Sequence, residues 1–301
     1  MPSLSAKFIR FIVKLSGIQK VFLQDPMLYQ KLRKNDVLEP AQRMIKGTKA
    51  RRFKLLNSTV TELVPTATKP SSYLLISCPG GAFVSGPNAT AWMPMAALVR
   101  NTGVNVWVVD YPKAPEHQLP EVAANLDAIY AKALEEYGAD RIFLIGDSAG
   151  GQLVLSLTQR LVAQGLPLPL HVIGVSPIVN MSMNNPEVQA IAPLDPVLAI
   201  KGITSSNRMA LGNASPTSAA FSPLLGTFEG FPSTTLFLAK HDILYPDGAL
   251  AAEKMKAEGV AVEVIVGQEM IHDWPYVPFV KEATAALAQI EERIAERMTN
   301  W

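Results

Sequence analysis

The sequence predicts an α/β protein with a mainly parallel central sheet that is flanked by helices. Two observations carry this prediction. Short apolar runs recur along the chain, most of them separated by helix-length segments, and within the runs the apolar residues are continuous rather than alternating. Continuous apolar strands are buried on both faces, which is typical of a parallel sheet with helices on each side. We therefore expect functional residues at the carboxyl ends of the strands.

The expected elements follow the chain in order. Residues 16–70 mix helix-like stretches with the segment NSTVTELVP, which predicts a strand before the linker TATKPSS. Six further strands are expected at 73–77, 104–109, 142–145, 172–175, 235–239 and 262–266, with a helix at 121–137 among the segments between them. Residues 181–220 lack a strand signal and are rich in Asn, Ser, Met and Pro, which predicts an insertion that contributes to a cap.

Composition and charge exclude several classes of protein. With 301 residues, of which 49% are hydrophobic and 18% charged, the chain can form one large domain or a domain with a lid. Its 27 basic and 26 acidic side chains nearly cancel, so we expect no nucleic-acid partner. The single cysteine, Cys78, rules out an intramolecular disulfide and fits a reducing compartment, so we expect a cytoplasmic protein. The oligomeric state stays open, with a homodimer as one option.

The N-terminal segment combines apolar and basic residues. Four basic side chains interrupt its apolar runs: Lys7, Arg10, Lys14 and Lys20. The runs between them are too short for a signal peptide or a membrane span, so we expect neither. The apolar residues are spaced roughly as a helix face: Phe8, Ile9, Ile12, Val13, Leu15 and Ile18. We favour a lid or packing helix here, and the alternative is a helix that lies on a membrane surface.

A turn of small residues, GDSAGG at 146–151, separates the expected strand at 142–145 from the helix-forming segment QLVLSLTQRLVAQG. This order is typical of a nucleophile on a sharp turn between a strand and a helix. Such a turn forces the nucleophile into an unfavourable backbone conformation, and Gly146 and Gly150 keep the strand and the helix from colliding. Ser148 is therefore the candidate nucleophile. A glycine-rich phosphate-binding loop is the alternative interpretation of this turn.

A serine hydroxyl needs a base that takes its proton and a third group that orients the base. Among the four histidines, His272 in GQEMIHDWP is the best placed, because it follows the last apolar strand and so opens on the same sheet edge as Ser148. His171 begins a strand and would lie at the opposite edge. If neutral His272 is the base, the rate should decline below a pH of roughly 6 to 7.

The orienting acid should come from another strand end, between the serine and the histidine in the chain. Asp242 follows the expected strand at 235–239 and is our candidate. Asp195 and Asp247 are weaker candidates. Asp273 is adjacent to the histidine, so we expect its side chain to point away from the ring that it would have to orient.

Backbone N–H groups should face the serine from a second loop to hold a developing oxyanion. The segment SCPGGAFVSG follows the expected strand at 73–77, and its consecutive glycines, Gly80 and Gly81, allow a close approach of backbone to a ligand. The N–H of Ala149, at the start of the helix after the nucleophile, is a further candidate donor. A simple glycine turn is the alternative interpretation of this loop.

These motifs together resemble those of the hormone-sensitive-lipase-like group of α/β-hydrolases. The marks of that group are an HGGGF loop, DYRLAPEH, GDSAGG and DPL followed by a histidine. Over residues 73–300 this chain has, in the same order, PGGAF at 79–83, DYPKAPEH at 110–117, GDSAGG at 146–151, HDIL at 241–244 and MIHDW at 270–274. The resemblance implies an α/β-hydrolase fold with a mostly helical cap. It also implies Ser148, Asp242 and His272 as the catalytic residues, and Gly80, Gly81 and Ala149 as oxyanion donors.

The chain departs from the group's pattern in the loop at 79–83 and directly after the predicted catalytic histidine. Pro79 and Ala82 replace the histidine and the third glycine of HGGG, so a side chain that normally braces the loop is absent. Proline fixes its own φ and could substitute for that bracing. Asp273 replaces the glycine after the catalytic histidine, and Trp274 follows it with a bulk that would narrow the pocket.

The resemblance implies an N-terminal cap segment at 1–55 and an α/β-hydrolase catalytic domain at 56–301, with a cap insertion at about 181–220. The candidate pocket residues are Phe83, Asp147, Met181, Met183, Met209, Trp274 and Tyr276. We expect a serine carboxylesterase that cleaves short- to medium-chain, neutral hydrophobic esters through an acyl-enzyme intermediate and needs no metal or cofactor. The alternatives are a non-catalytic small-molecule binding protein on the same fold and a lipase acting at a membrane surface.

Overall fold

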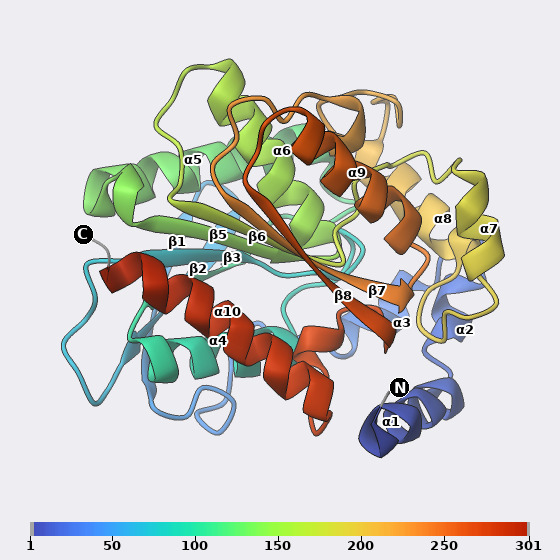
Figure 1. The fold of residues 1–301 in the computed structure, drawn as a ribbon, viewed down its shortest axis with the longest axis horizontal. Helices are drawn as coiled ribbons and strands as arrows, with labels where there is room; N and C mark the ends of the chain where they lie inside the picture. Colours follow the sequence, from blue (N-terminus) through green and yellow to red (C-terminus); the bar gives the residue numbers. More distant parts are fainter. Residues whose placement is uncertain (1–2, 300–301) are drawn as a thin grey trace.

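A computed structural model of the protein describes residues 3–299 and contains an eight-stranded sheet between two layers of helices (Figure 1). The strands are β1 (Thr48–Leu55), β2 (Ser58–Pro65), β3 (Leu74–Cys78), β4 (Asn105–Asp110), β5 (Ile142–Asp147), β6 (His171–Val175), β7 (Thr234–His241) and β8 (Val262–Ile271). Their order across the sheet is β1-β2-β4-β3-β5-β6-β7-β8. Only β2 runs against its neighbours, and the six strands from β4 to β8 are parallel. The predicted fold class is therefore confirmed.

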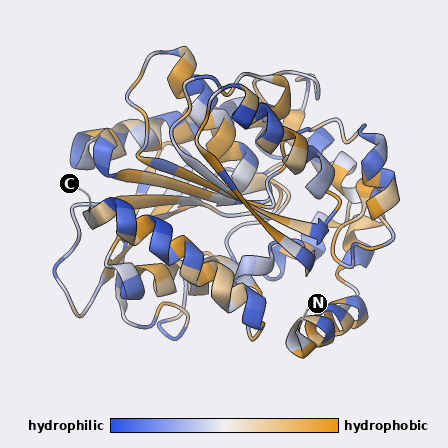
Figure 2. Ribbon diagram, in the orientation of Figure 1, coloured by the Kyte–Doolittle hydropathy of each residue, from blue (hydrophilic) through white to orange (hydrophobic). Residues whose placement is uncertain are grey.

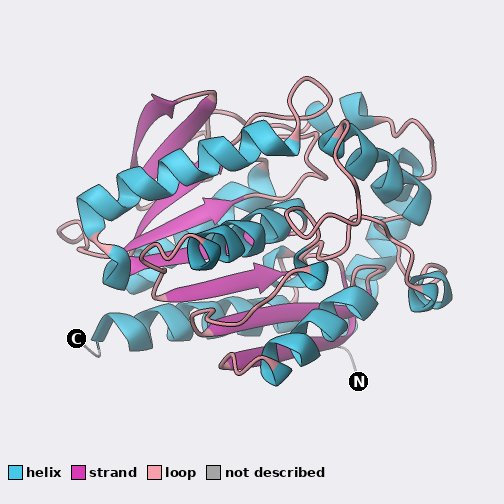
Figure 3. Ribbon diagram, turned by 90° about the horizontal axis from the view of Figure 1, so that it is seen from above, coloured by secondary structure: helices cyan, strands magenta, loops and turns pink. Residues whose placement is uncertain are grey.

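The helices form three groups around the sheet. On one face lie α4 (Ala89–Thr102) and α10 (Lys281–Thr299), and on the other face lie α5 (Leu119–Tyr137), α6 (Ala149–Ala163) and α9 (Tyr245–Ala257). Figure 3, seen from the side of the second group, shows helices crossing in front of the strands. The third group lies beyond the carboxyl ends of the strands and comprises α2 (Gln19–Phe22), α3 (Tyr29–Arg33), α7 (Pro186–Ile191) and α8 (Ile200–Leu211). The first helix, α1 (Leu4–Ser16), lies at the periphery, and the short 3₁₀ helices are η1 (Ala139–Arg141), η2 (Pro223–Leu225) and η3 (Trp274–Tyr276).

The central strands are apolar at every position because both of their faces are buried. Leu74 and Ile76 of β3 belong to the core beneath α5 and α6, whereas Leu75 between them belongs to the core beneath α4 and α10. Figure 2 shows the strands as a continuous hydrophobic layer. Full burial of such a side chain stabilises the fold by about 1.5–3 kcal/mol. This packing holds the strand ends rigidly, and the site is built on those ends.

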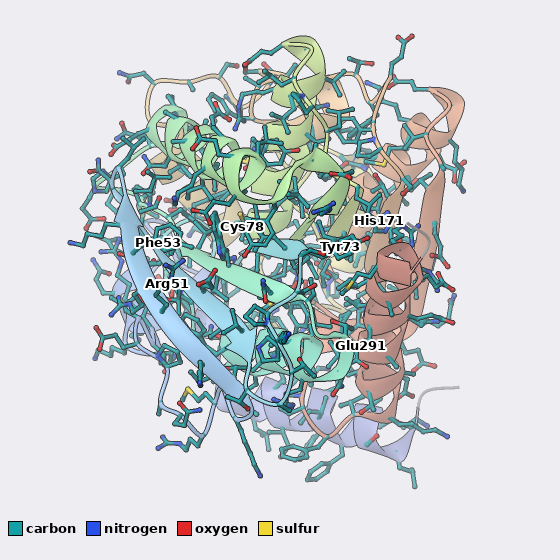
Figure 4. All side chains as sticks on the ribbon, turned by 90° about the vertical axis from the view of Figure 1, so that its left-hand side faces the viewer. Arg51, Phe53, Tyr73, Cys78, His171 and Glu291 are labelled. Atoms are coloured by element: carbon teal, nitrogen blue, oxygen red, sulfur yellow. The ribbon has the colours of Figure 1, made fainter. Side chains whose placement is uncertain are left out.

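All seven strands predicted from the sequence are present, but β1 was not predicted. Its sequence, TKARRFKL, is mostly exposed and rich in basic residues, which is typical of a protected edge strand. It pairs residue by residue with β2, from Thr48 opposite Pro65 to Leu55 opposite Ser58. Figure 4 shows two of its side chains, Arg51 and Phe53. The predicted boundary at residue 55 therefore falls inside a hairpin of the central sheet, and only the part of the N-terminal segment before β1 lies outside the sheet.

The part of the chain before β1 packs against the insertion between β6 and β7. The side-chain amide of Gln19 donates to the carbonyls of Asp195 and Leu198, at 2.6 and 3.1 Å. The N–H of Met27 donates to the hydroxyl of Ser205 in α8, at 3.0 Å. These two segments, far apart in the sequence, therefore cover the same end of the sheet. Within residues 3–299 we find no helix with the length and hydropathy needed to cross a bilayer.

Candidate active site

Ser148 lies on the turn that joins β5 to α6. Its backbone has φ of 52° and ψ of −117°, a conformation that a residue with a side chain rarely adopts. The glycines around it permit the turn: a Cβ on Gly146 would lie 2.2 Å from the carbonyl oxygen of Gly150, and a Cβ on Gly150 would lie 1.7 Å from that of Cys78. Any larger residue at either position would clash with the backbone, so both glycines have the role predicted for them: they let the strand and the helix pack closely.

Two backbone hydrogen bonds hold Ser148 in its strained conformation. Its N–H donates to the carbonyl of Val175 at the end of β6, at 2.8 Å, and its own carbonyl accepts from the N–H of Ile178, at 3.0 Å. Only 4% of Ser148 is exposed. The neighbouring strand and the loop after it therefore hold the backbone of Ser148 in place.

His272 and Asp242 meet beside this turn. Asp242 directly follows β7 and His272 directly follows β8, so parallel strands bring both to the same sheet edge. Nδ1 of His272 lies 2.7 Å from Oδ2 of Asp242, and the N–H of Leu244 donates to the other carboxylate oxygen, at 2.9 Å. The weaker candidates bind elsewhere: Asp195 accepts from the N–H of Ile243, and Asp247 accepts from the side chain of Asn185.

The side chain of Asp273 does not point away from His272, contrary to our expectation from the sequence. Its Oδ2 lies 3.2 Å from Nε2 of His272, because a left-handed backbone with φ of 53° folds the carboxylate back toward the ring. Its N–H donates to the hydroxyl of Ser176, at 3.2 Å, and its Oδ1 is buried without a hydrogen-bond partner among residues 3–299. Within the same residues no hydrogen bond joins the hydroxyl of Ser148 to His272, so Nε2 faces a carboxylate instead.

Buried charges determine the proton affinity of this cluster. Burial alone lowers the pKa of His272, but the charges of Asp242 and Asp273 outweigh it and hold that pKa well above its ordinary value. Burial also raises the pKa of Asp273, which the positive charge of His272 opposes. Burial, with the charge of Asp242 added, raises the pKa of Asp195 to about 7. The protonated form of His272 is therefore favoured, and the acidic limb of a pH–rate profile should lie above the range of 6 to 7 expected from the sequence.

Of the two glycines predicted as donors in the loop after β3, Gly81 lines the cavity over Ser148 and Gly80 does not. The N–H of Gly80 is not directed at the serine, because it donates to Oδ2 of Asp147, at 2.9 Å. Gly81 and Ala82 line the cavity beside Ser148, and Gly80 does not. No acceptor among the described residues binds the N–H of Gly81, Ala82 or Ala149. Gly81 and Ala82 therefore lie at the cavity, whereas Gly80 and Asp147 bond to each other and are not among its lining residues.

Side chains that the sequence analysis did not assign brace this loop. The hydroxyl of Tyr111 donates to the carbonyl of Pro79, at 2.9 Å, and so supports the loop where the group's usual histidine is absent. Arg33 of α3 donates to the carbonyls of Val84 and Ala114, at 2.7 and 2.8 Å. Tyr111 belongs to the DYPKAPEH motif, so that motif could have indicated its role. Nothing in the sequence pattern indicated a role for Arg33.

A cavity of about 180 Å³ opens over the serine. It is lined by Ile18, Phe22, Leu32, Asn35, Gly81, Ala82, Ser85, Asn88, Ser148, Val197, Leu198, Ile203, His272 and Asp273. Its walls therefore come from the N-terminal segment, the loop after β3, the insertion and the two catalytic strand ends. It is smaller than the roughly 300–1,000 Å³ typical of sites for drug-sized ligands.

The large side chains predicted for the pocket lie elsewhere. Phe83 is buried in the core, and its carbonyl accepts from the N–H of Ala114. Met181 lines a second cavity beside α8, and Met209 packs against the core from α8. Trp274 packs toward α10 and donates its indole N–H to the carbonyl of Leu238, at 3.2 Å. The other two candidates are buried in the two cores: Met183 and Tyr276. Side-chain size alone does not reveal which apolar residues face a cavity, since most of them face the core.

The remaining histidines have partners away from Ser148. His117 lies 2.9 Å from Glu121, His171 contacts Ser233 and Thr235, and His241 lies 2.8 Å from a guanidinium nitrogen of Arg10. His272 is therefore the histidine that the fold brings to the serine.

Comparison with known proteins agrees with this architecture. A family model described as alpha/beta hydrolase fold matches residues 75–276, so the chain belongs to this family, and the resemblance drawn from its motifs is confirmed. The chain is similar to an esterase of Acinetobacter venetianus, with 29% identity over 75% of this chain and 76% of the esterase. It is also similar to a triacylglycerol lipase of Mycobacterium tuberculosis, with 24% identity over 69% of this chain, and it spans only 44% of that lipase. A solved esterase from the bacterial hormone-sensitive lipase family shares the fold, with a TM-score of 0.85 and 24% identity over 99% of both chains.

Proposed function

We propose that the protein is a serine carboxylesterase that cleaves short- to medium-chain, neutral hydrophobic esters. The observation that carries this proposal is the shared cavity. Ser148 on its strained turn and His272 line it together, and Asp242 lies 2.7 Å from the far ring nitrogen of His272. The esterase and lipase names of its relatives support the same class of reaction.

The mechanism follows from these positions. With Nδ1 of His272 donating to Asp242, Nε2 of the neutral ring can accept the proton of Ser148 as the serine oxygen attacks the ester carbonyl carbon. The C=O bond becomes a single bond to an oxyanion. His272 then gives its proton to the departing alcohol, which leaves an acyl-enzyme. Water then attacks the acyl carbon while Nε2 takes its proton; the bond between this carbon and the oxygen of Ser148 breaks, Nε2 returns the proton to Ser148, and the acid is released.

Backbone amides of Gly81, Ala82 and Ala149 would hold the oxyanion. Gly81 and Ala82 line the serine cavity, and Ala149 begins the helix after the nucleophile, where N–H groups lack intrahelical acceptors. Removing one such donor typically costs about 2.7–4 kcal/mol of transition-state stabilisation. The hydrogen bonds from Tyr111 and to Asp147 therefore contribute to catalysis in this proposal, because they hold the loop that carries the amides of Gly81 and Ala82.

The lining of the cavity limits the substrate. Six of its side chains are bulky and apolar: Ile18, Phe22, Leu32, Val197, Leu198 and Ile203. No Lys or Arg lines it in the part of the chain that the structure describes, and Asp273 adds a carboxylate. An anionic acyl group would find no partner and would be repelled, whereas a neutral chain of a few carbons fits the apolar wall.

The direct test is hydrolysis of p-nitrophenyl acetate, butyrate, octanoate and palmitate by the wild type and by Ser148→Ala. We expect turnover of the shorter esters that falls by at least about 10³-fold in Ser148→Ala. Ser156→Ala is the matched control, because Ser156 is a buried serine in α6, the helix that follows Ser148, and its hydroxyl accepts from the side chain of Gln152 rather than lining the cavity. Its rates should stay close to those of the wild type.

The outcome that contradicts the proposal is equal inertness of wild type and Ser148→Ala on every ester, together with no labelling of Ser148 by a serine-reactive phosphonate. That result would favour a binding protein on the same fold. Labelling at Ser148 without turnover of these esters would instead place the error in the proposed substrate class, since the phosphonate reports an activated serine.

A further inference from the structure

The helix α1 presents a stripe of large apolar side chains to the outside of the molecule. The exposed fractions are 85% for Leu4, 64% for Phe8, 57% for Phe11, 41% for Ile12 and 68% for Leu15. At 3.6 residues per turn these positions fall within an arc of roughly 100° on one side of the helix. The opposite side faces the protein through Ala6 and Ile9. Figure 4 shows the side chains of this helix projecting from the lower edge of the molecule.

A loop held against α1 exposes a further large apolar side chain. Phe279, between η3 and α10, is 92% exposed. The N–H of Lys281 lies 3.4 Å from the hydroxyl of Ser5 in α1, so this loop is held against the first turn of the helix. Ser3, which caps α1, donates to the carboxylate of Glu282 through both its N–H and its hydroxyl. The helix and the loop that carries Phe279 are therefore bonded to each other and both expose apolar side chains, and exposed apolar surfaces on proteins are typical of interaction sites.

The charges beside the stripe indicate its partner. Residues 3–24 contain no Asp or Glu, and α1 carries Lys7, Arg10 and Lys14. Arg10 turns inward to His241, whereas Lys7 and Lys14 are exposed and, being seven residues apart, lie along the same edge of the stripe. An apolar face with a basic edge complements an anionic lipid surface. Antiparallel docking of a second copy would instead bring two basic edges together.

The helix is also connected to the proposed active site. Ile18 and Phe22, in the segment directly after α1, line the cavity over Ser148. Arg10 contacts His241, the residue before Asp242. A surface that held α1 would therefore lie close to residues that line the cavity over Ser148.

We propose that α1 and Phe279 form an interfacial anchor that docks the enzyme on anionic lipid, with the apolar stripe in the interface and Lys7 and Lys14 among the headgroups. The substrate class that this position favours is an ester partitioned into the lipid surface. The anchoring does not depend on the chemistry at Ser148, but this choice of substrate rests on the proposed function.

The test is co-sedimentation of the full chain with vesicles of phosphatidylcholine alone and of phosphatidylcholine with phosphatidylglycerol. We expect binding to the anionic vesicles that weakens with added salt and falls at least tenfold in Phe8→Ser/Phe11→Ser. The matched control is Leu56→Gln/Leu250→Gln, which changes two exposed leucines outside α1, at 61% and 52% exposure. This control should bind as the wild type does. Circular dichroism verifies that each variant is folded.

Three results would overturn the anchor: no sedimentation with anionic vesicles, equal loss in the control variant, or a concentration-dependent dimer that the Phe8→Ser/Phe11→Ser variant abolishes. The last would make the stripe an interface between copies of this chain. Sedimentation measures lipid binding and does not depend on ester hydrolysis. A failure of the proposed anchor can therefore be distinguished from a failure of the proposed esterase activity. Hydrolysis of p-nitrophenyl butyrate in free solution should be unchanged in the Phe8→Ser/Phe11→Ser variant.

Discussion

The carboxylate of Asp273 lies 3.2 Å from Nε2 of His272, the ring nitrogen that accepts the proton of Ser148 in the proposed mechanism. The ring is thus held between two carboxylates, with Asp242 on Nδ1 and Asp273 on Nε2. In the proposed mechanism Asp242 orients the base. Asp273 favours the protonated ring, which cannot act as a base, and so the residue next to the proposed catalytic histidine opposes its function at low pH.

Replacing Asp273 should therefore shift the pH dependence of hydrolysis. The pKa of His272 is raised above its ordinary value, so activity is present above that pKa and is lost as the pH falls through it. Asp273→Asn removes one cause of the increase and should lower the pKa, which moves the acidic limb of kcat/KM to lower pH and raises the rate at neutral pH.

The measurement is kcat/KM on p-nitrophenyl butyrate between pH 5 and 10. Asp140→Asn is the control, because it removes the same charge from an exposed position in η1. An acidic limb at the same pH in wild type and Asp273→Asn would contradict the role assigned to this carboxylate.

Tyr111→Phe should slow catalysis through the oxyanion loop. The change removes the hydrogen bond from the hydroxyl to the carbonyl of Pro79, which is worth about 1 kcal/mol, and should lower kcat roughly fivefold with little change in KM. Tyr130→Phe is the matched control, because Tyr130 donates to the carbonyl of Pro167 in the same way at 3.0 Å but far from the serine. A similar loss of kcat in both variants would indicate a general effect on stability instead.

Gly150→Ala should destabilise the fold severely. The new Cβ would lie 1.7 Å from the carbonyl oxygen of Cys78, and neither the start of α6 nor the end of β3 can move aside. We expect a loss of about 3 kcal/mol or more in the free energy of unfolding, measured by urea denaturation. In the control Gly248→Ala the nearest atom is the end of the flexible side chain of Leu238, at 2.9 Å, so the change should stay within about 1 kcal/mol. Equal effects in the two variants would show that helix propensity, not crowding at the turn, sets the result.

Leu198→Ala should extend the range of acyl chains. Leu198 lines the serine cavity, and its truncation adds room for further methylene groups, each worth up to about 0.8 kcal/mol when buried. The preferred p-nitrophenyl ester should therefore become longer. Leu211→Ala truncates a buried leucine of α8 outside this cavity and controls for the loss of about 2–5 kcal/mol of stability that either change brings. An unchanged chain-length preference in Leu198→Ala would place the acyl chain elsewhere.

The sequence by itself determined seven of the eight strands and placed Ser148, Asp242 and His272 at strand ends. Strands buried on both faces consist of continuous apolar runs, and the tight turn at 146–151 needs glycines at fixed spacing. Both features can therefore be recognised from short segments of the sequence. The parallel arrangement then places the ends of β5, β7 and β8 at one edge, which is why residues separated by about a hundred positions could be assigned to one site.

Only the tertiary structure determined which groups at that edge of the sheet contact one another. The N–H of Gly80 bonds to Asp147, so Ala82 rather than Gly80 lines the cavity, and a left-handed backbone turns Asp273 toward His272. The cavity wall comes from Ile18, Phe22 and Ile203, whereas the predicted methionines are buried elsewhere. The physical reason is that hydrogen bonds and packing join residues distant in the chain, and local composition does not record which of several suitable partners lies within reach.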